Sequence, residues 1–180
     1  MKNVLKVLSI IAISAVIAFS MTACGEGSGE GGEGSGEGGG GSITVNSTNG
    51  TLTISEIPTE YNGKWLYAVG LVDEYFLIAA QNVTSSSIQC APISNGTATL
   101  KVWKETEVSE NEVSLDNYNG SDQNVEFFIS VFNKQTLTQA EAEAASSGEE
   151  MPDFIVGFGA AEVDFTSGDG SGTFNDFFEE

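Results

Sequence analysis

The chain has 180 residues, with 26 acidic residues against 6 lysines, no arginine and no histidine, and a formal net charge of −20. Phosphate-binding surfaces need clustered Lys or Arg to release counterions, so this composition excludes nucleic acid as a partner. The same charge disfavours electrostatic docking on anionic lipid. A hydrophobic content of 40% with 11 Phe indicates that the larger part of the chain folds.

The first 23 residues have the three parts of an export signal. Lys2 and Lys6 supply a positive start, Val7 to Phe19 is an almost uninterrupted apolar run, and small residues follow. A transmembrane helix, the alternative, needs about 20 apolar residues to cross a hydrocarbon core of ~30 Å. Because this run is shorter, we expect residues 1–23 to be a signal peptide.

The four residues that end this segment are Met21, Thr22, Ala23 and Cys24. They resemble the lipobox of bacterial lipoproteins, although Met21 stands where an aliphatic residue such as Leu is more usual. The resemblance implies cleavage after Ala23, acylation of Cys24 with chains such as palmitate, and an anchor in the bacterial cell envelope. It places the mature chain at the outer membrane or the cell surface. Two or more acyl chains hold a protein on a bilayer far longer than one chain does.

Residues 25–42 consist of Gly, Glu and Ser only. Such a segment has no apolar side chain with which to form a core, and a Gly-rich chain of this length has an average end-to-end distance of about 23 Å. With the lipidated cysteine, residues 24–42 are therefore predicted to be a flexible tether. We expect it to hold a domain clear of the lipid headgroups; a linker whose composition has merely drifted is the alternative.

From Ile43 the pattern changes to alternation of apolar and polar residues with turn residues between the runs, which predicts one antiparallel β domain over 43–180. In the run from Thr97 to Glu105, alternate residues from Ala98 are expected on one face. Asn95-Gly96 before it predicts a tight hairpin. The strands are predicted at 51–55, 64–72, 76–83, 87–90, 97–105, 125–133, 154–158, 160–166 and 171–177.

Two segments depart from this strand pattern. The charged stretch Thr106 to Gln123 is predicted to be a loop in which Val113 and Leu115 pair only briefly. The acidic residues around its start, which include Glu105, Glu107, Glu110 and Glu112, are predicted to be a solvated edge. Thr138 and Glu141 form a capping box, which predicts one short helix that ends by Gly148.

A short phrase occurs twice, as Tyr61-Asn62-Gly63 and as Tyr118-Asn119-Gly120. A duplicated four-stranded meander would give about eight strands, a number that suits a small closed barrel of lipocalin-like size. Chance repetition of common turn residues is the other explanation, and a β-sandwich is the alternative fold. Together with the Glu-Gly linker, the phrase is similar to small surface lipoproteins of spirochaetes, a resemblance that implies no known activity.

The residues that could carry chemistry are few. Without histidine there is no nucleophilic triad or usual zinc site, and Cys90 is left without a partner if Cys24 is acylated. We read Cys90 as a small buried hydrophobe. A calcium-loop spacing begins at Asp169, but Phe174 stands where the loop needs Gly, so a hairpin is favoured. We therefore expect no enzyme, no cofactor and no metal.

Trp65 and Trp103 are the candidate binding aromatics, if they share an exposed face; buried, they belong to the core. The favoured function is a monomeric, non-catalytic binding or adhesion module that contacts a host or envelope protein or glycan. A carrier of a small apolar ligand inside a barrel is one alternative. A structural envelope protein is another.

Overall fold

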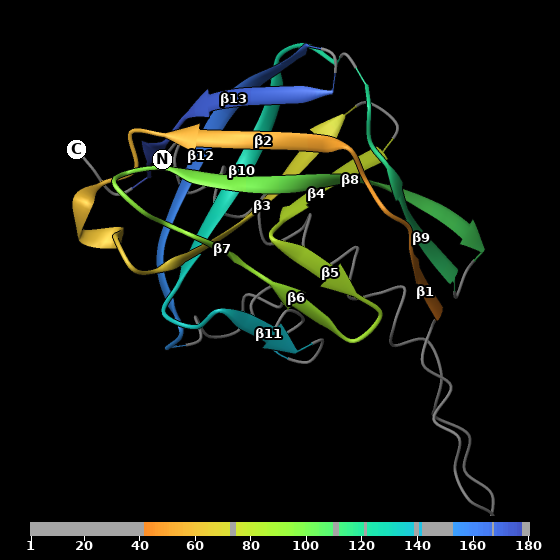
Figure 1. Cartoon of the computed structure of the whole chain (residues 1–180), viewed down its shortest axis with the longest axis horizontal. Helices are drawn as coiled ribbons and strands as arrows, with labels where there is room; N and C mark the ends of the chain where they lie inside the picture. Colours follow the sequence, from red (N-terminus) through yellow and green to blue (C-terminus); the bar gives the residue numbers. More distant parts are fainter. Residues whose placement is uncertain are drawn as a thin grey trace, which may run out of the picture.

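The computed structural model describes residues 42–72, 75–109, 112–120, 122–138, 141, 153–166 and 168–177. The predicted signal peptide, the lipobox, Cys24 and residues 25–41 of the tether lie outside these ranges. The described elements are β1 (Ser42–Val45), β2 (Gly50–Ser55), the 3-10 turn η1 (Thr59–Tyr61), β3 (Trp65–Val72), β4 (Tyr75–Ala80), β5 (Asn82–Thr84), β6 (Ser87–Gln89), β7 (Ala91–Pro92), β8 (Ala98–Ser109), β9 (Glu112–Asn117), β10 (Val125–Phe132), β11 (Thr136–Thr138), β12 (Ile155–Thr166), β13 (Asp169–Thr173) and β14 (Asn175–Asp176) (Figure 1).

Seven strands close into a barrel, in the order β8, β2, β13, β12, β10, β3 and β4. The pairing of β4 with β8, from Leu77↔Lys104 to Ala80↔Lys101, returns the sheet to its first strand. This closure confirms the predicted all-β barrel and excludes the sandwich. The ring has one strand fewer than the expected eight, because residues 154–158 and 160–166 form the single strand β12.

One pair in the ring is parallel. β2 runs beside β13 with Thr51 opposite Asp169 and Ser55 opposite Thr173. The remaining ring pairs are antiparallel. The expectation of a purely antiparallel barrel is therefore wrong at this seam, where the first and last strands of the ring meet. The local patterns of the two strands contain no sign of it, since pairing direction depends on the path of the chain between them.

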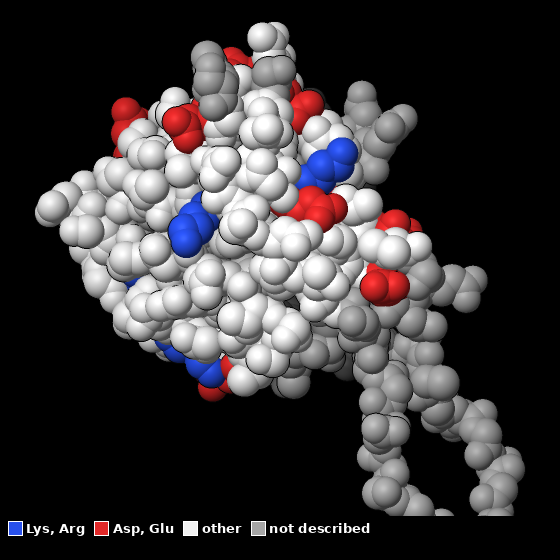
Figure 2. Space-filling view, turned by 45° about the vertical axis from the view of Figure 1, so that its right-hand side comes forward, with Lys and Arg blue, Asp and Glu red and all other residues white. Residues whose placement is uncertain are grey.

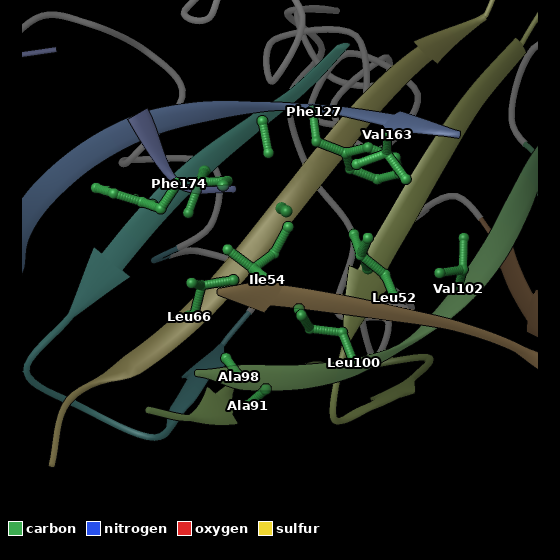
Figure 3. Close-up of a cluster of buried hydrophobic side chains, with 14 of the residues drawn as sticks. Leu52, Ile54, Leu66, Ala91, Ala98, Leu100, Val102, Phe127, Val163 and Phe174 are labelled. Carbon is green, nitrogen blue, oxygen red and sulfur yellow. The ribbon is translucent and has the colours of Figure 1, made fainter. Parts of the chain in front are cut away.

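Side chains fill the interior of the ring (Figure 3). Ala98, Leu100 and Val102 point inward from β8, as the alternation predicts, and each is at most 2% exposed. Across the ring, Phe127 of β10 and Val163 of β12 point toward them and are also buried. This common core makes residues from both halves of the chain one folding unit.

Glycines on the barrel wall make room for the aromatic rings of this core. A Cβ atom on Gly70 would lie 2.8 Å from the ring of Phe127, and one on Gly159 would lie 2.5 Å from the ring of Phe174. Real Cβ atoms do not approach so closely, so any larger residue at these positions would displace a ring. The core is packed to the point where a single methyl group matters.

The outer face of the barrel is partly covered as well. β5, β6 and β11 form a separate three-stranded sheet, while β9 lies beside β8 and β1 beside β9. Val83 of β5 and Ile88 of β6 pack on Val69 and Ile78, which face outward from the barrel. On β10, Phe132 is buried, whereas Phe128 is only half-buried.

The segment predicted to be a charged loop is a β-hairpin. β8 continues past its last pairing with β2, at Val102, and pairs with β9 from Trp103↔Asn117 to Ser109↔Glu112. Val113 and Leu115 pair as expected, but as part of a strand of six residues. β1 then adds to β9 in parallel. We call the outer half of β8 together with β9 and β1 the flap.

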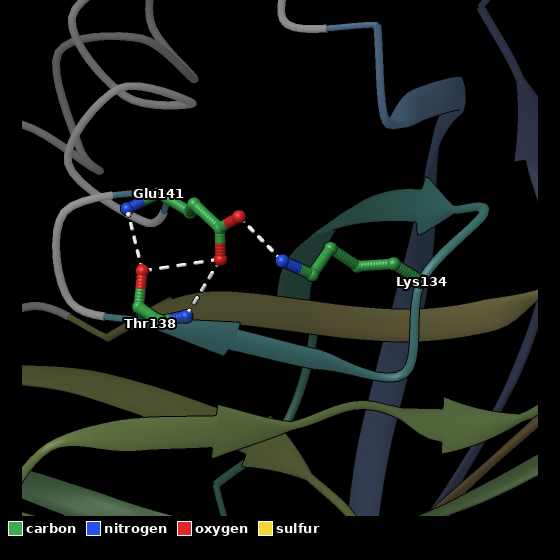
Figure 4. Close-up of polar contacts among 3 residues, drawn as sticks. All are labelled: Lys134, Thr138 and Glu141. Atoms are coloured by element: carbon green, nitrogen blue, oxygen red, sulfur yellow. Dashed lines mark hydrogen bonds and ion pairs between the residues drawn. The ribbon is translucent and has the colours of Figure 1, made fainter.

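Two local predictions concern turns and caps. Asn95 and Gly96 both have positive φ, 52° and 68°, and Ser94 and Thr97 exchange two backbone hydrogen bonds, so the tight hairpin is confirmed. The capping box is confirmed too: Glu141 N–H donates to Thr138 Oγ1, and Thr138 N–H donates to Glu141 Oε2 at 2.9 Å (Figure 4). Lys134 pairs with the same carboxylate. The remainder of the predicted helix lies outside the described residues.

Candidate functional site

A groove with a volume of about 530 Å³ lies on the outside of the barrel, between β1 and the β5–β6 hairpin. The outer side of β8 forms its base. This volume falls within the range of pockets that hold small ligands, about 300–1,000 Å³. The residues that line it are Ile43, Val45, Asn46, Ser47, Thr48, Asn82, Val83, Thr84, Ser85, Lys101 and Trp103.

Some of the polar side chains in this lining already have partners. Thr48 Oγ1 donates to the carbonyl of Val102 at 2.5 Å and accepts from the Tyr118 N–H. Asn46 Nδ2 donates to Asp116 at 2.7 Å, and Thr84 Oγ1 closes the turn before β6. These bonds connect both walls of the groove to the strands behind them, so the site is largely formed before any ligand arrives.

Four other polar side chains of the lining make no hydrogen bond within the described part of the chain. They are the exposed residues Ser47, Asn82, Ser85 and Lys101. Their hydroxyl, amide and ammonium groups can all donate, and all but the ammonium can accept. The groove therefore presents unused hydrogen-bonding groups beside the apolar side chains of Ile43 and Val45.

The charge of the groove differs from that of the whole chain. No Asp or Glu is among its described lining residues, and Lys101 is the charged group. Lys104 instead lies over the Tyr75 ring at 3.9 Å, and Lys134 is paired with Glu141. Figure 2, which brings the β1 side forward, shows broad uncharged surface between scattered acidic residues. An anionic group would meet less repulsion here than over the acidic parts of the surface.

The two candidate aromatics do not form one exposed patch. Trp103 is 2% exposed, and its Nε1–H donates to the Asn46 carbonyl at 2.9 Å, so it supports the groove from beneath. Trp65 is half-buried and packs with Phe132 and Cys90 in a different cluster. Both face outward from the barrel interior, yet both are covered by other elements. The structure therefore places Trp103 at the groove and Trp65 away from it.

Glu105 is a residue that the sequence pattern misplaced. It lies at the root of the flap, half-buried, and its Oε2 is buried with no hydrogen-bond partner among the described residues. Burial, with a smaller contribution from Glu107, raises the pKa of the Glu105 carboxyl to about 7. Burial also raises the pKa of the Tyr67 hydroxyl, and the nearby charge of Glu105 raises it further. The interpretation of Glu105 as a solvated edge charge is wrong.

Cys90 and the calcium-like spacing give no reactive site. Cys90 is fully buried, as expected, and burial raises the pKa of its thiol to about 12. Asp169, Ser171 and Thr173 lie exposed on β13, in a hairpin with β12, and Asp169 accepts a hydrogen bond from Thr51. Within the described ranges, no group of three or more His, Cys, Asp or Glu could hold a metal ion.

The fold defines this protein as a closed seven-stranded β-barrel with a filled interior and a groove on its outer face. No family model, no curated protein and no solved structure matches the chain. Among the described residues, no helix is long and apolar enough to cross a membrane.

Proposed function

We propose that the chain is a bacterial cell-envelope lipoprotein that acts as a non-catalytic binding module. Acylation of Cys24 anchors it in the outer membrane, residues 24–42 form the tether, and the barrel makes the contact. The observation that carries this proposal is the groove beside β1, which combines a formed shape with unused polar groups. Its described lining contains no histidine, cysteine or carboxylate, which favours binding over catalysis.

The filled interior of the barrel favours a binding module that uses its outer surface over a carrier of apolar ligands. The inward side chains of β2, β8, β10 and β12 are buried against one another, and glycines accommodate their rings. A ligand inside would have to displace these groups, at a cost similar to that of overpacking a core, about 1–3 kcal/mol or more. The outer groove requires no such displacement.

The anchor is tested by mass spectrometry of the mature N-terminus and by cell fractionation. The expected result is a diacylglyceryl-modified Cys24 at the first position and a protein that stays with the membrane, while a Cys24→Ala chain does not. An unmodified Cys24 thiol on the mature protein would contradict the proposal.

The exposure and the binding are tested on intact cells. Added protease is expected to remove the β domain before the membrane is broken; resistance would place the domain on the inner side of the outer membrane.

Cells carrying the Asn82→Ala/Lys101→Gln chain should lose attachment to envelope or host material. The Lys104→Gln chain should keep it, since Lys104 lies over Tyr75 and not in the groove. Equal attachment by cells that carry the wild type and by cells that carry either variant would refute the groove as the contact.

A further inference from the structure

We propose that the groove between β1 and β5 binds a short saccharide that carries a carboxylate. This inference rests on the proposed binding function and names its ligand class. The first argument is the chemistry of the lining. Sugars present hydroxyls that both donate and accept, beside C–H faces that pack on apolar groups. Ser47, Asn82 and Ser85 offer matching polar groups, and Ile43 and Val45 offer the apolar contact.

The second argument is charge complementarity. Lys101 is exposed on β8 and no Asp or Glu of the described lining competes for it. Two carboxylates lie in the neighbouring networks: Asp116 accepts hydrogen bonds from Asn46 and Ser114, and Asp169 accepts one from Thr51, which lies opposite Lys101. The Lys101 ammonium group has no carboxylate partner among the described residues. An anionic group on a ligand would form an ion pair with it. A sugar carboxylate supplies that anion together with the hydroxyls.

A peptide fits the groove less well. A peptide commonly adds as a strand to a sheet edge, and β5 is such an edge, since it pairs with β6 alone in the small sheet. However, β5 has three residues, and short edge strands are a way in which proteins prevent strand addition. On the opposite wall Ile43 and Val45, two residues apart, present side chains from one face of β1. An extended peptide would therefore form few backbone hydrogen bonds with the two walls of the groove.

The position of the groove indicates where the saccharide is found. β1 is both a wall of the groove and the first described strand, directly after residue 41. The predicted tether of 18 residues has an average reach of about 23 Å, so the groove stays close to the lipid anchor. The ligand that fits this position is an acidic saccharide of the cell envelope itself, within reach of the outer membrane.

The test is a titration of the full-length protein, purified in detergent, followed by NMR. The probes are a trisaccharide that ends in glucuronic acid and the same trisaccharide ending in glucose. We expect shifts confined to groove residues, and tighter binding of the acidic probe. Lys101→Gln should lower the affinity for the acidic probe by about fivefold, the upper end of the effect of an exposed ion pair, and leave the affinity for the neutral probe unchanged. Lys104→Gln, with the same charge change, should alter neither.

The outcomes separate this inference from the proposed function. No groove shifts with either saccharide, equal binding of both, or equal effects of the two lysine variants would each overturn the inference. Groove shifts caused instead by an extended peptide of alternating Val and Thr would assign the site to a peptide and also overturn it. If saccharides fail while the Asn82→Ala/Lys101→Gln cells still lose attachment, the binding function stands and the ligand class is wrong.

Discussion

Tyr61 and Tyr118 close opposite ends of the barrel. Tyr118 packs edge-on against Phe165 at 4.8 Å near Gly50, where β2 begins, and Tyr61 packs against Phe174 at 6.2 Å near the end of β2. Each hydroxyl bonds an aspartate, Asp122 for Tyr118 and Asp176 for Tyr61. The repeated Tyr-Asn-Gly phrase therefore marks two end closures of one ring.

The Tyr118 end should contribute more stability than the Tyr61 end. Tyr118 is 2% exposed and donates to Asp122 at 2.8 Å, whereas Tyr61 is half-buried and its bond to Asp176 is 3.3 Å long. We expect Tyr118→Phe to lower the free energy of unfolding by about 1–2 kcal/mol and Tyr61→Phe by about 0.5 kcal/mol. Urea unfolding measures both. A larger loss for Tyr61→Phe would contradict the assignment.

Gly70→Ala should destabilise the barrel through its contact with Phe127. The added methyl group would lie 2.8 Å from the ring, so either the ring or the strand must move. We expect a loss of about 1–3 kcal/mol in urea unfolding. The matched control is the double change Gly70→Ala/Phe127→Leu, in which the smaller side chain makes room. The loss of Gly70→Ala on the Phe127→Leu background should be clearly smaller, and equal losses on both backgrounds would rule out this contact as the cause.

Glu105 should make stability depend on pH near neutrality. Burial raises the pKa of its carboxyl from the ordinary 4.5 to about 7 in the folded protein. A group whose pKa is raised on folding contributes stability that is complete below about pH 4.5 and is lost as the pH rises through 7. Glu105→Gln, which stays neutral, should therefore be more stable than the wild type at about pH 8, by on the order of 1–2 kcal/mol after allowance for partial exposure.

Urea unfolding at two pH values measures this effect, and Glu126→Gln is its control. Glu126 is exposed on β10, so its replacement changes the net charge equally without removing a buried carboxyl. The advantage of Glu105→Gln should vanish near pH 4.5, and Glu126→Gln should show none at either pH. An equal gain from both variants would mean that general charge reduction is the cause.

Cys90 should resist alkylation in the folded protein. Its thiol is buried and burial raises its pKa to about 12, so the reactive thiolate is scarce at neutral pH. In a Cys24→Ser chain, which carries Cys90 as its one thiol, labelling by iodoacetamide at about pH 8 should be at least a hundredfold slower than in urea. Mass spectrometry follows the label. Rapid labelling of the folded chain would show that the cluster around Cys90 opens.

The sequence predicts the parts of the barrel that depend on local pattern. The alternation at Ala98, Leu100 and Val102 gives the inward face of β8, and Asn95-Gly96 gives the turn before it, because both are set by neighbouring residues. The capping box at Thr138 and Glu141 is local in the same way. These features need no knowledge of the partner strand.

The missed features depend on contacts between distant residues. Glu107 lies on a strand, but the charge of its segment indicates a loop, since only the partner β9 explains a strand there. Glu105 ends the predicted strand, and the sequence alone does not show that its carboxyl is buried. Asp122, which accepts from Tyr75 and Tyr118, could not be singled out among 26 acidic residues. The groove joins residues near 45, 83 and 101, and its one recognisable signal was Trp103.

The parallel seam between β2 and β13 has a consequence for the order of events during folding. Thr51 and Asp169, which face each other across it, are 118 residues apart in the chain. The ring cannot close until β13 has been synthesised, and contacts of such long range form slowly. Until then the edge of β2 is available to other chains. The barrel therefore cannot be completed before β13 is available, so residues 169–173 determine when the ring closes.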